Sequence, residues 1–366
     1  MISTAPFPII SVEGGAYDRG VQYGSQAKTL IEEALKLYRE SFKNAANLDW
    51  DRALQLGKKF VPYIEGYDPE VMEEMEGITK GSGRTFEEIL ILNARSEVMY
   101  SAKSGVKIEE EGCTVMAATP EVTSSKHMLV GQNADWIPAS QKLWLLTKKK
   151  KRGGLNCVTF AEAGVVGKMG LNEAGILSFG NALASNRARL GVPLQIISNY
   201  VLSAETVADA IFRILSARRG ASNNRVIADA EGLCRDIEAE TEDFNCLSPE
   251  DGILVHANHF LGPTYHFRDY MPMASPSTLI RRDRAYELLA RERGRITVDV
   301  MKKIFSDHLG KPSSVCTHVD EKHPKGFQSN QTIASLIVDL NERKLEIAKG
   351  PPCQNEYVTI DLTDIL

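Results

Sequence analysis

Apolar positions in the first hundred or so residues repeat with the period of a helix. Apolar side chains recur every three or four residues, which places them on one face of a helix. Thr85 and Glu88 have the spacing of a capping box, in which two side chains bind free N–H groups at the start of a helix. The clearest apolar stripe consists of Ile31, Ala34, Leu35, Tyr38 and Phe42. The pattern predicts a mainly helical segment over residues 1–112.

From residue 113 onward, short strand-like runs replace the helical pattern. Each run is rich in apolar residues and is bounded by turn residues, which is typical of β-strands. The predicted strands are 113–117, 128–133, 143–147, 156–160, 176–179, 225–228, 253–256, 335–339 and 344–348. Helical periodicity returns at 193–202, 205–217, 278–290 and 298–308. This alternation of blocks predicts an α+β fold in which helices are layered on stacked sheets, with the helical lead on the outside. No repeat or low-complexity linker indicates a second domain.

Composition and charge exclude several classes of partner. The chain is 43% apolar and 25% charged, as expected for a globular protein with a large core, and its net charge is -5. This charge predicts no attraction to nucleic acid or to anionic membranes. The single basic run, Lys148 to Arg152, precedes Gly153-Gly154 and is interpreted as a solvated hairpin tip rather than a binding patch. No run of 18 apolar residues and no signal-like N-terminus is present, so we expect a cytoplasmic protein.

The six cysteines give no sign of a disulfide framework or a metal centre. They are scattered without a CxxC pair or metal-ligand spacing, so we expect a reduced compartment and neither metal nor cofactor. Cys316-Thr317-His318 is interpreted as containing a core cysteine rather than a thiol-protease dyad. His256 and His259 around Asn258 leave a metal site open as an alternative to local hydrogen bonding. The cysteines are Cys113, Cys157, Cys234, Cys246, Cys316 and Cys353.

The junction between Gly112 and Cys113 carries the strongest chemical signal. Cys113 sulfur can attack the Gly112 carbonyl, and hydrolysis of the resulting thioester leaves Cys113 as a new N-terminus. Glycine suits the upstream position because it lacks Cβ and tolerates a strained backbone. One residue then carries both a thiol nucleophile and an α-amine, with a reference pKa of about 7.7 to 8.0, that can act as its base. The junction therefore predicts an autocleaved catalytic cysteine, although burial as a small apolar residue is the alternative for any free cysteine.

Two further polar residues are candidates for the same site. Asp135 follows the strand predicted at 128–133 and can orient the α-amine or assist self-cleavage, as the third group of a triad does; a turn residue is the alternative. Asn258 follows the strand predicted at 253–256 and offers an amide donor for the tetrahedral oxyanion.

These residues belong to a set of motifs that resembles the acyl-coenzyme A:6-aminopenicillanic acid acyltransferase family of cysteine-type N-terminal-nucleophile hydrolases. The likeness runs from about Ile9 to the strands near Ala348. Its motifs are Glu111-Gly112-Cys113-Thr114, Gly131-Gln132-Asn133-Ala134-Asp135, Glu162-Ala163-Gly164, Gly167-Lys168-Met169-Gly170, Val255-His256-Ala257-Asn258-His259 and the helical segment Leu92-Asn93-Ala94-Arg95-Ser96-Glu97.

The resemblance implies a four-layer αββα fold and a proenzyme that is cleaved before Cys113. Residues 1–112 would form the helical α fragment and 113–366 the catalytic β fragment, with both associated in one αββα domain. Cys113 would be the nucleophile, Asp135 the aspartate needed for processing and Asn258 the oxyanion donor. One departure concerns the fungal penicillin enzymes, which have a serine and an arginine where this chain has Gln328-Ser329-Asn330-Gln331. The chain also ends in Asp364-Ile365-Leu366 rather than in their peroxisomal tripeptide, so we do not expect penicillin synthesis.

The leading hypothesis is an enzyme that cleaves a linear amide bond through a Cys113 thioester and releases the acyl group to water. A second hypothesis transfers the acyl group, taken from acyl-coenzyme A or an amide, to an amine. A third is a catalytically silent binding protein with the same fold. The expected ligand is therefore a small amide or an acyl-coenzyme A. Trp136, Phe160 and Glu162 are candidate substrate contacts, although aromatic residues beside a sheet are more often core and a glutamate at a strand end is more often solvated.

Overall fold

The described residues form two β-sheets. The computed structural model describes residues 5–102, 112–264, 266–322 and 329–364. In sheet order, the eight-stranded sheet consists of β1 (Ile9–Gly14), β4 (Trp144–Lys151), β5 (Cys157–Glu162), β6 (Met169–Asn172), β7 (Leu177–Ala182), β8 (Asn223–Ala228), β9 (Cys234–Ala239) and β10 (Phe244–Leu247). The six-stranded sheet consists of β11 (Ile253–His256), β2 (Gly112–Ala118), β3 (Leu129–Trp136), β12 (Gln331–Asp339), β13 (Lys344–Lys349) and β14 (Val358–Asp361). Neighbouring strands are antiparallel except β1 and β4.

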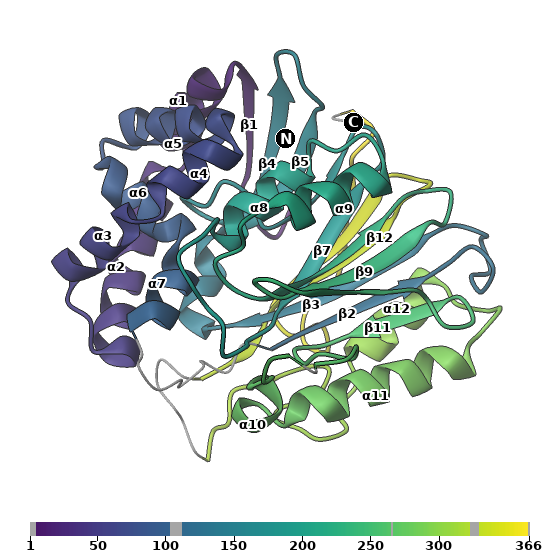
Figure 1. The fold of residues 1–366 in the computed structure, drawn as a ribbon. Coiled ribbons are helices and arrows are strands. Elements are labelled where there is room, and N and C mark those ends of the chain that lie inside the picture. The colour runs from purple at the N-terminus through teal and green to yellow at the C-terminus, as the bar shows by residue number, and fades with distance from the viewer. Residues whose placement is uncertain (1–4, 103–111, 265, 323–328, 365–366) are drawn as a thin grey trace.

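Helices cover the outer faces of the two stacked sheets. Helices α8 (Leu194–Val201) and α9 (Val207–Ser216) lie on the eight-stranded sheet, and α11 (Ser277–Arg291) and α12 (Val298–Phe305) lie on the six-stranded sheet (Figure 1). The short helix α10 (Met271–Ala274) precedes α11. Between the sheets, the Gln132 side chain donates to Gly180 O at 2.8 Å and accepts from Gly180 N–H at 3.1 Å. The predicted α+β, four-layer αββα architecture is confirmed.

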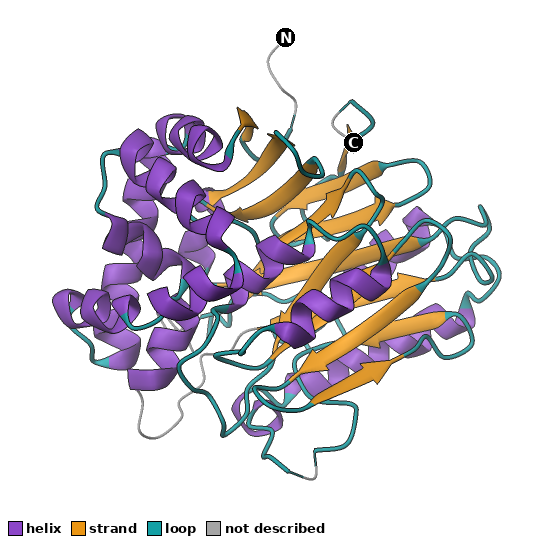
Figure 2. Cartoon of the chain, turned by 45° about the horizontal axis from the view of Figure 1, so that its top comes forward, coloured by secondary structure: helices purple, strands orange, loops and turns teal. Residues whose placement is uncertain are grey.

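The N-terminal helices form a block beside the sheets (Figure 2). They are α1 (Ala16–Gln26), α2 (Lys28–Ala46), α3 (Trp50–Lys58), α4 (Val61–Tyr67), α5 (Pro69–Ser82), α6 (Phe86–Asn93) and α7 (Arg95–Ala102). The predicted stripe on α2 is buried, and the predicted capping box between Thr85 and Glu88 opens α6. One continuous apolar core joins the helical block to both sheets, from Phe7 to Leu362. A short 3₁₀ helix, η1 (Pro138–Leu143), connects β3 to β4.

The prediction that the basic run forms a solvated hairpin tip is wrong for its lysines. Lys148 to Lys151 belong to β4 itself, and only the residues after them turn, with Gly153 at φ +78°. Strand alternation sends Lys149 to the covered face, where its ammonium group binds Glu74 and Val166 O. A buried ammonium is tolerated because a buried carboxylate and a carbonyl oxygen surround it.

Five strands have no counterpart among the predicted elements: β1, β6, β9, β10 and β14. Strand β9 illustrates the reason, because Arg235, Asp236 and Glu238 make its sequence look like a solvated loop. In the fold, Asp236 and Glu238 are fully buried, and Glu238 pairs with His256 of the other sheet. Among the described residues, no helix combines the length and apolar character needed to cross a bilayer.

Candidate active site

Cys113 is the second residue of β2, which lies between β11 and β3. In the β2–β3 register, Cys113 is opposite Ala134 and Gly112 is opposite Asp135. Side chains alternate along a strand, so Cys113 shares one face of the sheet with Ala134, and Gly112 shares the other face with Asp135. Cys113 is half-buried, and Asp135 is buried.

Neighbouring contacts identify these two faces. Gln132 alternates in phase with Ala134 and bonds to β7 of the facing sheet. Asn133 alternates in phase with Asp135, and its side-chain nitrogen donates to Phe305 O of α12 at 2.9 Å. Cys113 therefore faces the space between the two sheets, while Asp135 lies on the side of α11 and α12.

Asn258 contacts the backbone nitrogen of Cys113. The residue is two positions beyond β11, and its Oδ1 accepts a hydrogen bond from Cys113 N–H at 2.8 Å. Its Nδ2 donates to Ala182 O at 3.0 Å, and its own N–H donates to Thr278 Oγ1 at 2.7 Å. The side chain is fully buried and held at both ends, so it presents a fixed acceptor to the nitrogen that cleavage would convert to an α-amine.

Arg281 of α11 is part of this site, although no sequence motif indicates it. One guanidinium nitrogen donates to Cys113 O at 2.6 Å and to Thr114 Oγ1 at 3.0 Å, and the other donates to Asn258 Oδ1 at 3.0 Å. Burial lowers the pKa of Arg281, and the charges of Asp135 and Cys113 act against that lowering. One feature could have indicated Arg281: it is the only charged residue among the buried residues of α11. These buried residues are Thr278, Arg281, Ala285 and Leu289.

Asp135 is buried beside the Gly112–Cys113 bond and is held by two hydroxyl groups. Its Oδ1 accepts from Thr332 Oγ1 at 2.6 Å, and its Oδ2 accepts from Thr317 Oγ1 at 2.8 Å. Burial raises the pKa of its carboxyl group to about 6, while Arg281 and the two hydroxyl groups limit the rise. A carboxyl group with this pKa changes its charge close to neutral pH, as is common for groups that move protons at functional sites. No sequence motif indicates a role for either threonine.

Gly112 has a steric reason to be glycine. A Cβ at this position would lie 2.7 Å from Asn330 Nδ2 and 2.9 Å from Asp135 Oδ2, so any other side chain would displace the groups beside the bond. Close approach of neighbouring groups therefore gives a steric reason for glycine at this position. Glu110 and Glu111 before it, and Gln328 of the segment that contains Asn330, lie outside the described residues.

The three candidate substrate contacts lie in packed surroundings. Trp136 Nε1 donates to the Tyr38 hydroxyl at 3.0 Å, and the ring of Phe160 packs against Phe7 and Trp144. Each of the two aromatic side chains is at least 95% buried. Of the two, Trp136 is two residues beyond Ala134 on β3 and shares the face of Cys113.

Glu162 is completely buried in a charge network. Its carboxylate binds the Arg95 guanidinium through both oxygens at 2.9 Å and accepts from the Tyr38 hydroxyl at 2.5 Å. Burial would raise the pKa of Glu162, but Arg95 and Lys168 outweigh it and hold the pKa below its usual value. This network fastens α7 and α2 to the end of β5, which is a structural task.

Glu162→Gln is expected to lower the free energy of unfolding by roughly 3 kcal/mol, because Arg95 would keep a buried charge without its counter-charge. Urea denaturation measures the change. The matched control is Glu87→Gln, which removes a surface pair with Lys58 and should cost less than about 1 kcal/mol. A Glu162→Gln protein of unchanged stability but reduced kcat/KM would instead assign Glu162 to the substrate.

The histidines around Asn258 are occupied by hydrogen bonds. His256 Nε2 lies 2.9 Å from Glu238 Oε1, and its Nδ1 lies 2.7 Å from Ala257 O. His259 Nδ1 lies 3.0 Å from Thr278 Oγ1. Among the described residues these histidines belong to no cluster of potential metal ligands, so local hydrogen bonding explains them.

The four-layer αββα fold is that of the N-terminal-nucleophile hydrolase class. The chain belongs to the acyl-coenzyme A:6-aminopenicillanic acid acyl-transferase family, whose model matches residues 122–354. Membership confirms the resemblance found in the sequence. It also confirms the prediction of an enzyme of the amidohydrolase and acyltransferase class that acts on carbon–nitrogen amide bonds.

Individual proteins show similarity over different parts of the chain. The acyl-coenzyme A:6-aminopenicillanic-acid-acyltransferase 40 kDa form of Emericella nidulans is 27% identical over 364 residues, covering 94% of this chain and 92% of that protein. A mutant of conjugated bile acid hydrolase from Clostridium perfringens has a TM-score of 0.46 at 13% identity, covering 69% of this chain and 93% of that one. Penicillin V acylase from Agrobacterium tumefaciens has a TM-score of 0.44 at 14% identity, covering 69% and 86%.

Proposed function

We propose that this protein is an autoprocessed cysteine hydrolase that cleaves a linear amide bond through a thioester on Cys113. In the processing step, the Cys113 sulfur attacks the carbonyl carbon of Gly112, and the bond from that carbon to the Cys113 nitrogen breaks. The nitrogen takes up the proton that the thiol loses. Water then hydrolyses the thioester, leaving a Gly112 carboxylate and a free Cys113 thiol and α-amine.

Asp135 is the group assigned to processing. Its Oδ2 would lie only 2.9 Å from a Cβ on Gly112, so its carboxylate stands directly beside the bond to be cut. Asp135 lies on the other face of β2 from the Cys113 thiol, so its carboxylate would act on the peptide bond itself: with a pKa of about 6 it can take up a proton at this bond and return it to the leaving nitrogen near neutral pH.

The hydrogen bond from Cys113 N–H to Asn258 Oδ1 carries the proposal for turnover. After cleavage, the same nitrogen is the α-amine, and Asn258 would hold it beside the thiol of its own residue. The amine accepts the thiol proton, the sulfur attacks the substrate carbonyl, and the departing amine takes that proton as the carbon–nitrogen bond breaks. Water then releases the acyl group as a carboxylic acid and restores the thiol.

Arg281 and Asn258 supply the electrostatics of this cycle. The buried positive charge of Arg281 disfavours a second positive charge, so it should lower the pKa of the new α-amine and keep more of it in the basic form. The Asn258 amide has two N–H bonds; one donates to Ala182 O, and we assign the other to the tetrahedral oxyanion.

The shared apolar core supports lasting association of the two fragments, 1–112 and 113–366. Residues of α2 and α6 are buried in the same apolar cluster as residues of β3 and β5, including Ile31, Leu90, Val130 and Phe160. Cutting one peptide bond removes none of this burial, so the fragments should stay together without a covalent link.

Acyl transfer to an amine is the second candidate, and the Emericella nidulans relative favours it. That protein is named as an acyltransferase with acyl-coenzyme A and 6-aminopenicillanic acid. The thioester on Cys113 would be the same, with acyl-coenzyme A as an alternative donor, and only the group that attacks it would differ. Exclusion of water from the acyl-enzyme decides between the two outcomes.

Mass spectrometry of the purified protein tests the proposal, with two fragments of residues 1–112 and 113–366 as the expected result. A panel of N-acyl amino acids, acylated amines and β-lactams should then identify a hydrolysed amide. Partitioning with added amine separates the candidates: release of acid that is insensitive to amine supports hydrolysis, whereas an amide product that rises with amine supports transfer. An active protein that remains one intact chain contradicts autoprocessing. A chain that is neither cleaved nor active supports the third hypothesis, a catalytically silent binding protein.

A further inference from the structure

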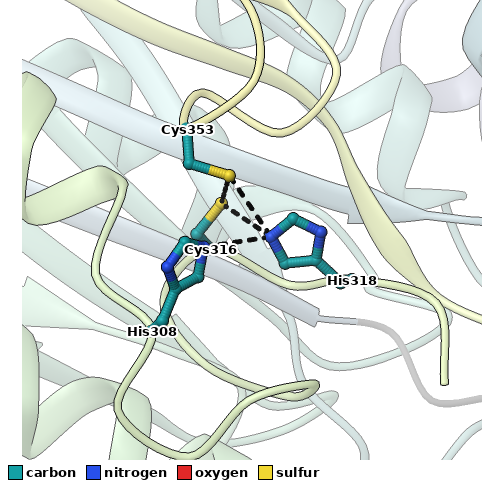
Figure 3. Close-up of side chains that lie close together, drawn as sticks. All are labelled: His308, Cys316, His318 and Cys353. Atoms are coloured by element: carbon teal, nitrogen blue, oxygen red, sulfur yellow. Dashed lines mark hydrogen bonds between the residues drawn. The ribbon is translucent and has the colours of Figure 1, made fainter.

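Four potential metal ligands from three segments converge beside the six-stranded sheet (Figure 3). His308 lies just after α12, Cys316 and His318 lie in the following loop, and Cys353 lies in the loop after β13. Their ligand atoms all lie within 4.8 Å of one another. The spacing along the chain has no metal-binding pattern, because Cys353 is 35 residues from His318 and only the fold brings it near.

Four of the six distances among these atoms are close to those of a tetrahedral zinc site. Zn²⁺ bonds of about 2.3 Å to sulfur and about 2.0 to 2.1 Å to nitrogen imply tetrahedron edges of about 3.8 Å for S–S, 3.5 Å for S–N and 3.3 Å for N–N. The two sulfurs are 3.6 Å apart, and His318 Nε2 lies 3.5 Å from Cys316 Sγ and 3.4 Å from Cys353 Sγ. The two imidazole Nε2 atoms are 3.1 Å apart. The edges from His308 to the two sulfurs are within 4.8 Å.

The donor set and its access also suit zinc. Two thiolates and two imidazoles form the Cys₂His₂ set of closed, structural zinc sites, whereas Mg²⁺ and Ca²⁺ require oxygen ligands. Cys353 and His308 are exposed, and a cleft of about 500 Å³ is lined by His318, so a hydrated ion has a route to the ligands. The buried sulfur of Cys316 closes the inner side.

We propose that His308, Cys316, His318 and Cys353 bind one Zn²⁺ ion in a structural site. Binding releases the two thiol protons and joins the end of α12 and its following loop to the loop after β13. The loop after α12 also contains Thr317, whose hydroxyl group donates to Asp135. By fixing this loop, the ion would help to hold Asp135 in place without contacting it. The proposal does not depend on the proposed reaction, because the ligands are separate from Cys113.

Metal analysis of the full-length protein purified with a reducing agent tests the proposal. We expect about one zinc per chain, retained after gel filtration and removed by a strong chelator. Cobalt added to the chelated protein should give the absorption of a tetrahedral site with thiolate ligands. Removal of zinc should also lower the thermal unfolding midpoint, and added Zn²⁺ should restore it.

Variants at the exposed ligands identify the site with little risk to folding. Cys353→Ser and His308→Ala should each weaken zinc binding at least tenfold in competition with a chromophoric chelator. Cys246→Ser, at an exposed cysteine of β10 outside the cluster, should bind zinc like the unaltered protein. Absence of stoichiometric zinc after reconstitution, equal binding by all variants, or an unfolding midpoint that zinc does not alter would overturn the proposal. A Cys316–Cys353 disulfide that persists under reducing purification, seen by mass spectrometry, would overturn it as well.

Discussion

Cys113→Ala is expected to leave the chain as one intact polypeptide and to lower amide turnover by about 10⁴-fold or more. Removal of the nucleophile from an acyl-transfer enzyme has effects of this size, because the covalent route is lost while binding and oxyanion contacts remain. Alanine keeps the Cys113 N–H and its hydrogen bond to Asn258, so the fold around the site should persist. Mass spectrometry measures cleavage, and kcat/KM on an identified amide measures turnover.

Two comparisons separate loss of the nucleophile from other effects of the substitution. Cys246→Ser, at the exposed cysteine of β10, should be cleaved and active like the unaltered protein. A thiol-directed acyl probe applied to protein that is already cleaved should label Cys113 and block turnover, which tests catalysis apart from processing. Cys113→Ala protein that is still cleaved, or is active at the original rate, would disprove the role of Cys113.

Asp135→Asn is expected to slow self-cleavage by about 10²- to 10⁴-fold, the usual contribution of a positioned acid or base. The amide has nearly the same shape, so Thr317 and Thr332 can keep their hydrogen bonds by rotating their hydroxyl groups. The rate is measured from the decay of the intact chain after synthesis or refolding. In the unaltered protein this rate should fall as the pH drops through about 6, because the carboxylate takes up a proton there. The Asp135→Asn variant should lack that pH dependence.

Stability gives a second test of the same carboxyl group. Burial favours its neutral form and raises the pKa from 3.8 to about 6. The stability that this neutral form contributes is therefore complete below about pH 3.8 and is lost as the pH rises through about 6. A rise of about two pKa units corresponds to roughly 3 kcal/mol. An asparagine side chain carries no such dependence, so between about pH 4 and 7 the stability of the Asp135→Asn variant relative to the unaltered chain should improve by this amount.

The stability of the chain with Asp135 and that of the Asp135→Asn variant are both measured in proteins that also carry Cys113→Ala, because this substitution keeps the polypeptide intact. Asp339→Asn serves as a matched control, because Asp339 is only partly buried and its partner is His127 near the far end of β12. It should leave self-cleavage unchanged. A pH profile of cleavage that the unaltered chain shares with the Asp135→Asn variant would show that another group controls processing.

Short-range patterns were sufficient for most of the helices and for the strands that carry the site. Neighbouring residues in the stripe on α2, and the two residues of the capping box of α6, are three or four positions apart, so their geometry follows from the helix itself. The sequence predicted the wrong environment for charged residues whose partners are distant in the chain. The sequence predicts a solvated Lys149. In the fold, its ammonium group is buried and donates to the carboxylate of Glu74, 75 residues earlier in the chain.

The same distinction applies to the candidate site. Cys113, Asp135 and Asn258 stand in recognisable motifs, and the structure places the Asn258 side chain 2.8 Å from the Cys113 nitrogen. Arg281 and Thr332 stand in no such motif. Arg281 reaches Cys113 O from 168 residues along the chain, and Thr332 reaches Asp135 from 197. Arg281 and Thr332 occupy ordinary helix and strand positions, and they contact the site only because α11 packs on the six-stranded sheet and β12 pairs with β3.

The sequence by itself determined the layered α+β class, the helical lead and the Gly112-Cys113 junction, because periodicity and the chemistry of adjacent residues act over a few positions. Only the tertiary structure decided which charges are buried in pairs, which groups surround Cys113 and that two histidines and two cysteines converge outside the site. Those outcomes depend on distances between segments far apart in the chain, and such distances are set when the sheets and helices pack together.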